Sequence, residues 1–116
     1  MSMVAGTFRM TDSEFEALAE GAIAMLERAI EACAPDLDTE TKGAGVLEIA
    51  FADGAKIVVN RHTAAREIWV AARSGGFHFR LDGKAWRDTR DGYEFFAALS
   101  RLVSAGGKTP VILSPG

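Results

Sequence analysis

The sequence has few of the residues that staple a small protein together. Its 116 residues include one cysteine, Cys33, so no internal disulfide can form. An iron–sulfur cluster needs about four cysteine thiolates, so this chain alone cannot hold one. Cys33 falls on the apolar side of a predicted helix, where we expect it to be buried and inert. These features favour a reducing, cytoplasmic compartment.

Long apolar runs are also missing. No segment approaches the roughly 18 apolar residues that could cross a membrane, and the first residues lack a basic stretch followed by an apolar core. Residues 1–9 have no clear period and precede a second methionine, Met10. We interpret them as a disordered tail, a misassigned start or a remnant of cloning. We expect no membrane association, one domain at residues 10–113 and a C-terminal tail at 114–116.

Charge is distributed unevenly along the chain. The net charge is −3, but residues 1–54 hold eleven acids and three bases (−8), whereas residues 55–116 hold ten bases and five acids (+5). This asymmetry predicts a charged partner or ion on at least one side. Nucleic acid is not expected as a partner, because the chain is acidic overall and the arginines mingle with glutamates.

Periodicity predicts a helix, six strands and a second helix. The first helix begins in "TDSEFE", where both Thr11–Glu14 and Ser13–Glu16 fit a capping box, and it ends before Pro35. Its apolar arc is expected to contain Phe15, Leu18, Ala22, Met25, Leu26, Ala29 and Cys33. Strands are expected at 36–42, 46–51, 55–60, 67–73, 77–81 and 84–88, with Asp-Gly turns at 53–54 and 82–83. The second helix is expected to begin with a capping pattern, Asp91 to Glu94, and to end at Gly106-Gly107.

The predicted elements each have one apolar face. The chain is therefore expected to form an α+β two-layer sandwich, with two terminal helices on one face of a twisted antiparallel sheet. The other sheet face, which we call the open face, would meet water. Alternation assigns to it Glu48, Lys56, Val58, Asn60, Trp69, Arg73, His78 and Arg80. Trp86, beside the second helix, is expected in the core.

Acidic residues gather on one side of the first helix. At 100° per residue, five carboxylates lie within about 100° of arc, and three more alternate along the next strand. We call these eight residues the acidic ridge: Asp12, Glu16, Glu20, Glu27, Glu31, Asp36, Asp38 and Glu40. A generic acidic stripe is most often a solvated surface. The functional alternative is a shallow, weakly selective site for hard cations, or a contact for a basic protein.

The second candidate feature is Trp69, on the open face. With Asn60, Arg73 and His78 around it, this tryptophan has the composition of an interface hot spot. Equally, a loop could cover it, or Arg73 or Arg80 could stack on it. The two histidines are isolated in the sequence and no serine stands in a nucleophile motif, so the residues predict no catalytic centre.

Several segments together resemble the bacterial frataxin family. They are "MTDSEFEALAE" (10–20), "GAGVLEIAF" (43–51), "DGAKIVVNR" (53–61), "EIWVAARSGGFHFRL" (67–81), Trp86 and "DGYEFFAALS" (91–100). The resemblance covers about residues 10–113 and implies the frataxin fold. It also implies a non-enzymatic protein that binds Fe2+ and Fe3+ weakly, docks on a cysteine desulfurase and modulates cluster formation on a scaffold protein. An iron-oxidising, iron-storing ferroxidase is the alternative.

The resemblance assigns roles by position. The acidic ridge matches the metal-binding residues of the family, and we expect a monomer in the absence of iron. Asn60, Arg61 and Trp69 match the partner-facing sheet of the family. The residue patterns add Glu27, Glu31, Arg73 and His78 to the predicted partner-binding residues. Arg28 and Ala32 stand where many bacterial members have acids, and His62 replaces a glutamine that usually follows Asn-Arg. These differences dilute the ridge and alter the expected partner contacts.

Overall fold

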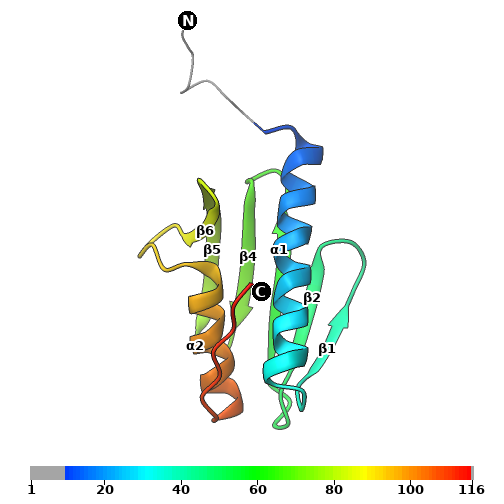
Figure 1. The fold of residues 1–116 in the computed structure, drawn as a ribbon, viewed down its shortest axis with the longest axis vertical. Coiled ribbons are helices and arrows are strands. Elements are labelled where there is room, and N and C mark those ends of the chain that lie inside the picture. Colours follow the sequence, from blue (N-terminus) through cyan, green and yellow to red (C-terminus); the bar gives the residue numbers. More distant parts are fainter. Residues whose placement is uncertain (1–9, 116) are drawn as a thin grey trace, which may run out of the picture.

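A computed structural model of the chain describes residues 10–115, so the predictions for residues 1–9 and Gly116 lie outside the described part. The predicted elements are present in the predicted order (Figure 1). They are α1 (Asp12–Cys33), β1 (Asp38–Thr41), β2 (Val46–Ala50), β3 (Lys56–His62), β4 (Glu67–Ala72), β5 (Gly75–Asp82), β6 (Ala85–Asp88) and α2 (Phe95–Gly107). No helix within residues 10–115 is long and apolar enough to cross a membrane.

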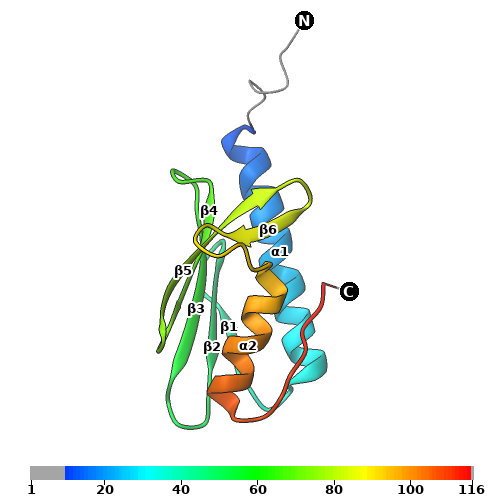
Figure 2. The ribbon, with the colours of Figure 1, turned by 90° about the vertical axis from the view of Figure 1, so that its left-hand side faces the viewer.

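The strands form one antiparallel sheet in the order β1 to β6, each paired with its neighbour in sequence. Both helices lie on the same side of this sheet, as the edge-on view in Figure 2 shows. The α+β two-layer prediction is therefore confirmed. Because consecutive strands pair directly, short turns suffice, and the Asp-Gly turns contain Gly54 and Gly83 at φ 90° and 66°. Positive φ is inexpensive only for glycine.

The hydrophobic core lies between the helices and the sheet. One face of the strands supplies fully buried aliphatic and aromatic side chains, with alternate residues pointing the other way. Those buried on this face include Leu47, Ile49, Ile57, Val59, Ile68, Val70 and Phe79. Trp86 joins them with 7% of its surface exposed, and its ring meets Phe15 edge-on at 5.9 Å between centroids. The predicted core position of Trp86 is confirmed.

The buried side of α1 differs from the predicted arc. The buried residues are Phe15, Ala19, Ala22, Ile23, Leu26, Ala29 and Ile30. At 100° per residue, the centre of this arc is rotated by about 50° from the predicted one. Leu18 is consequently 49% exposed, and Cys33 is exposed because it is the last helical residue. The predictions that Leu18 is core-facing and that Cys33 is buried were wrong.

Local hydrogen bonds define the helix ends. At α1, Thr11 and Glu14 form a reciprocal capping box, because each side chain accepts from the other's backbone N–H. At α2, the N-cap is Glu94, whose carboxylate accepts from the backbone of Phe96 and Ala97. The prediction that the capping pattern starts α2 at 91 was therefore wrong. The carboxylate of Asp91 accepts from Tyr93 N instead.

The chain after α2 turns back along the helix (Figures 1 and 2). The hydroxyl oxygens of Ser104 and Ser100 accept from the backbone N–H groups of Val111 and Leu113, both at 2.8 Å. Leu113 is thereby held in the core with 3% exposure. Both helix interior serines thus bind an extended segment that has no strand partner of its own.

Candidate functional site

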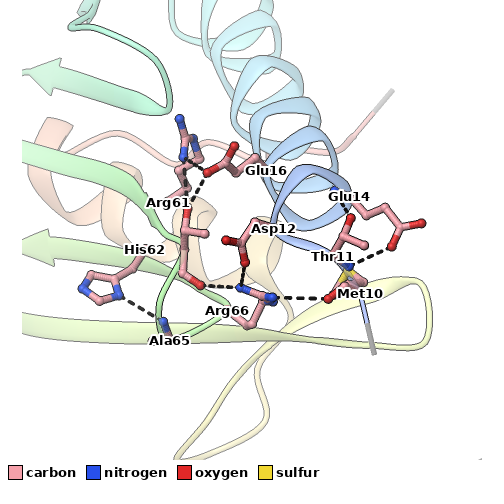
Figure 3. Close-up of polar contacts among 10 residues, drawn as sticks. Met10, Thr11, Asp12, Glu14, Glu16, Arg61, His62, Ala65 and Arg66 are labelled. Carbon is pink, nitrogen blue, oxygen red and sulfur yellow. Dashed lines mark hydrogen bonds and ion pairs between the residues drawn. The ribbon is translucent and has the colours of Figure 1, made fainter. Parts of the chain in front are cut away.

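The first half of the acidic face of α1 is already occupied by arginines. Arg61 of β3 lies with Nη1 3.0 Å from Glu16 Oε2 and Nε 2.7 Å from Glu20 Oε2. The second of these is a close ion pair without the alignment of a hydrogen bond. Arg66 reaches Asp12 Oδ1 at 2.7 Å (Figure 3). The β3–β4 hairpin therefore supplies a cation to each of these three acids.

Arg61 does not lie on the sheet face for which it was predicted. It faces α1, because it pairs across the sheet with the buried Ile68, whereas its neighbour Asn60 pairs with Trp69 on the open face. Successive strand residues point to opposite sides, so Asn60 and Arg61 cannot both face the open side. The prediction that grouped Arg61 with Asn60 and Trp69 was wrong about its position.

In the second half of α1, the acidic ridge has no arginine or lysine paired with it among residues 10–115. Glu27 is half-buried and Glu31 exposed, and neither has an ion pair with any residue in the described range 10–115. Within that range, no three His, Cys, Asp or Glu side chains gather closely enough to hold a metal ion. The ridge is thus a row of separate carboxylates on a helix surface.

The strand acids do not extend the ridge. Glu40 pairs with Glu48 across the β1–β2 ladder, and Asp38, two residues before Glu40, points to the same side of β1. Glu48 lies on the face opposite to the buried Leu47 and Ile49, so Asp38 and Glu40 project to the open face, away from α1. Asp36 is exposed in the turn after α1. The prediction that Asp36, Asp38 and Glu40 continue the acidic ridge was wrong, because the ridge ends where the chain leaves α1 and enters the sheet.

Two lysines pair with Glu48 of β2, near the β1 edge of the open face. Lys42 and Lys56 lie 3.3 and 3.4 Å from the carboxylate oxygens of Glu48. Desolvation raises the pKa of Glu48, but the hydrogen bonds and charges of these two lysines outweigh it and hold the pKa below its usual value. The edge of the open face therefore carries a mixed, largely balanced set of charges.

Trp69 is held in a three-ring stack on the open face. The His62 ring lies 3.8 Å from the indole at an interplanar angle of 14°, and the His78 ring lies 4.6 Å away at 11°. Both faces of the indole are therefore covered by imidazoles, and the side chain is half-buried. The predicted alternatives were an uncovered hot spot or a tryptophan covered by a loop or arginine. The structure instead shows histidines as the stacking partners.

A buried carboxylate anchors this stack. Glu67 accepts from Trp69 Nε1 at 2.8 Å and from Arg80 Nη2 at 2.6 Å, and its side chain is only 8% exposed. His78 Nδ1 lies 3.5 Å from the same carboxylate. Sequence reasoning missed this role of Glu67 and the pairing role of His62. The available signal for Glu67 was its spacing of two residues from Trp69, which puts both on one strand face.

The remaining predicted partner residues separate into two groups. Asn60 and His78 flank Trp69 directly in the β3–β4–β5 register. Arg73 lies beyond the other end of β4, 74% exposed and 3.6 Å from Asp53. A backbone hydrogen bond from Ala55, together with the charges of Arg73 and Lys108, holds the pKa of Asp53 below its usual value. Arg73 is thus part of a separate corner of the sheet.

Comparison with known sequences agrees with this architecture. The family model described as a frataxin-like domain matches residues 8–109. The chain is 59% identical over 104 residues to the iron-sulfur cluster assembly protein CyaY of Dechloromonas aromatica, covering 90% of this chain and 99% of the relative. It is 51% identical over 108 residues to the CyaY protein of Janthinobacterium sp., covering 90% and 96%.

Solved structures give the same result. Frataxin from Psychromonas ingrahamii superimposes with a TM-score of 0.84 at 30% identity, covering 90% of this chain and 99% of that one. Trimeric yeast frataxin, complexed with ferrous iron, has a TM-score of 0.63 at 23% identity, covering 89% and 93%, and shares the fold. The chain therefore belongs to the frataxin family, and within it to the bacterial CyaY proteins of iron–sulfur cluster assembly.

Proposed function

We propose that this protein is an iron-binding adaptor that regulates iron–sulfur cluster assembly by docking on a cysteine desulfurase. The observation that carries the proposal is that Glu27 and Glu31 of the acidic ridge have no ion-pair partner within residues 10–115. The ferrous complex of yeast frataxin and the assembly role of the CyaY relatives support it. The cytoplasm is the proposed compartment, and a monomer is the proposed state without iron.

Two carboxylates one helical turn apart suit a cation that must be released again. Their Cβ atoms lie about 6 Å apart, close enough for both to contact one hydrated ion. Iron ions coordinate carboxylate and water oxygens. A site with two protein ligands on an open surface binds the ion weakly and exchanges it readily. Such a surface can deliver iron to an assembly partner, whereas a closed cage would retain it.

The same charges would guide docking. A desulfurase surface rich in lysine and arginine is attracted to the acidic face, and this attraction is screened over a Debye length of about 10 Å at 0.1 M salt. The open sheet face supplies a second contact through Asn60 and the stacked Trp69. The scaffold protein would then be reached through the desulfurase complex.

The docking proposal is tested by charge removal with a matched control. We expect Glu27→Gln with Glu31→Gln to weaken binding to the desulfurase about tenfold at low salt. Asp82→Asn with Asp91→Asn removes the same charge from two exposed positions outside the acidic ridge, and should change affinity less than about twofold. Isothermal titration calorimetry at two salt concentrations measures both. Equal losses in the two double variants would contradict docking through the acidic face.

The ferroxidase alternative has one observation in its favour, the trimeric ferrous complex of yeast frataxin. A ferroxidase would consume oxygen when mixed with Fe2+ and would then assemble into larger particles. Stopped-flow oxygen measurements alongside light scattering distinguish the two functions. Consumption no faster than in buffer supports the adaptor, and catalytic consumption with assembly supports the ferroxidase.

A further inference from the structure

The contact between Arg61 and α1 is a built site for a guanidinium. Arg61 contacts Glu16 and Glu20 as described, and its Nη1 also donates to Thr63 Oγ1 at 3.1 Å. Thr63 in turn donates to Glu16 Oε2 at 2.9 Å. The carboxylates, hydroxyl and guanidinium thus form one connected group, and the Arg61 side chain is only 19% exposed.

Packing around the stem holds this arginine in position. Gly45, at φ +76°, lies so close to Arg61 that a Cβ there would overlap Cγ, Cδ and Nε of the arginine. The Arg61 backbone N–H also donates to Gly45 O at 2.9 Å. The Arg61 side chain therefore lies between Gly45 of the β1–β2 turn and the carboxylates of α1.

An arginine in this position competes with metal ions for the same oxygens. A cation that binds the carboxylate oxygens in contact with Arg61 must displace the guanidinium, which would lose both carboxylate partners while its side chain is mostly buried. No comparable group faces Glu27 and Glu31 within the described chain. The i,i+4 pairs Glu16/Glu20 and Glu27/Glu31 are alike in sequence but differ in this respect.

From this geometry we propose that Arg61 is a specificity-determining residue of the ridge. Its guanidinium acts as a tethered cation that occupies the Glu16/Glu20 pair and restricts binding of divalent cations to the Glu27/Glu31 end. This inference rests on the proposed iron-binding function, since it concerns where on the same surface the metal binds. Arg66 likewise forms an ion pair with Asp12, with 2.7 Å between Nη1 and Oδ1.

Paramagnetic NMR with Mn2+ as the probe can resolve the two pairs. The centres of the two pairs are eleven residues apart, about 16 Å along the helix, and paramagnetic broadening falls steeply with distance, so a bound ion broadens the amides of its own pair most. In the natural protein, the amides of Glu27 and Glu31 should broaden at Mn2+ concentrations about fivefold lower than those of Glu16 and Glu20. Broadening at equal concentrations at both pairs would overturn the inference and leave the iron-binding proposal standing.

Arg61→Met removes the guanidinium while keeping an apolar stem beside Gly45. In this variant the Mn2+ concentration that broadens Glu16 and Glu20 should fall about five- to tenfold, and that for Glu27 and Glu31 should change less than twofold. Arg28→Met is the matched control, because it removes one positive charge from an exposed position on the same helix. An equal effect of Arg28→Met on Glu16 and Glu20 would show that net charge alone is responsible.

Arg61→Lys tests the same point with less disturbance of packing. Lysine keeps the charge but cannot contact two carboxylates with a planar fork. The Mn2+ concentration that broadens the Glu16 and Glu20 amides should therefore fall by about two- to threefold. Should Arg61→Met fail to fold, this variant and the natural protein decide the question. Absence of broadening in every variant would contradict cation binding by the ridge, and with it the proposed function.

Discussion

The two tryptophans show how differently the two faces of the sheet are built. Trp86 is 7% exposed and packs edge-on against Phe15, so its contacts are those of an apolar core. Trp69 lies between two imidazoles and donates its N–H to the carboxylate of Glu67. On the covered face, burial of apolar area stabilises the fold. On the open face, stacking and a hydrogen bond fix the orientation of the Trp69 indole, so the two faces are stabilised by different kinds of contact.

The largest effect is expected on the covered face. Leu26→Ala removes a side chain with 0% exposure and should lower the free energy of unfolding by about 2–5 kcal/mol. Leu18→Ala, on the same helix but 49% exposed, should cost below about 1 kcal/mol. Urea denaturation measures both. Similar losses would contradict the orientation of α1 found here.

A smaller effect is expected at the anchor of the open face. Glu67→Ala leaves Trp69 Nε1 without its acceptor and Arg80 without its ion pair, which should cost about 1–3 kcal/mol of unfolding free energy. The Trp69 indole N–H resonance should shift while that of Trp86 stays. Asp82→Ala removes a carboxylate only 3.8 Å from Arg87 and 77% exposed, and should leave both observables nearly unchanged. A shift of the Trp86 resonance would show that the two faces are coupled.

The stacking histidines should contribute less than the anchor. His62→Ala removes the ring at 3.8 Å and opens one face of Trp69, at a cost of about 0.5–1.5 kcal/mol of unfolding free energy. Quenching of tryptophan fluorescence by acrylamide should increase. His78→Ala, on the opposite face of the indole, is the matched variant and should act in the same direction. Unchanged quenching in both would mean that the imidazoles do not shield the indole.

The smallest effect concerns Asp53 and its pH dependence. Its pKa lies below the ordinary 3.8, chiefly because Ala55 N–H donates to the carboxylate. The stabilisation from this ionised carboxylate is fully present above pH 3.8 and is lost as pH falls through the lower pKa of the folded state. Asp53→Asn should therefore destabilise the protein at neutral pH, and the difference should shrink on acidification. Thermal unfolding from pH 7 to pH 2.5 measures this, and a difference that grows with acid would contradict it.

Local rules predicted much of the fold. The Asp-Gly turns, the Thr11–Glu14 capping box and the strand alternation all depend on residues near one another in sequence, and the structure confirms them. The start of α2 was missed because Asp91 and Glu94 can both cap a helix, and tertiary contacts chose the later one. Element boundaries are therefore less determined by sequence than element order.

The candidate site was predicted in its composition but only partly in its arrangement. Helical spacing correctly identified one acidic side of α1, and alternation correctly assigned Trp69 to the open face. Neither rule could show that Arg61 covers Glu16, or that two histidines stack on Trp69, because the partners come from different strands and helices. Interpreting each residue by itself left His62 without a role and assigned His78 to partner binding rather than to stacking on Trp69.

The sequence by itself determined which residues share a face of each strand and helix, because side-chain periods of 2 and 3.6 follow from backbone geometry. Only the tertiary structure decided how α1 is rotated against the sheet, and therefore that Ile23 is buried while Leu18 is exposed. The tertiary structure also decided which acids of α1 pair with arginines of the β3–β4 hairpin. Glu16 and Thr63 are 47 residues apart and yet share a hydrogen bond, a contact that depends on how the hairpin docks on the helix. Packing of the whole core sets that docking.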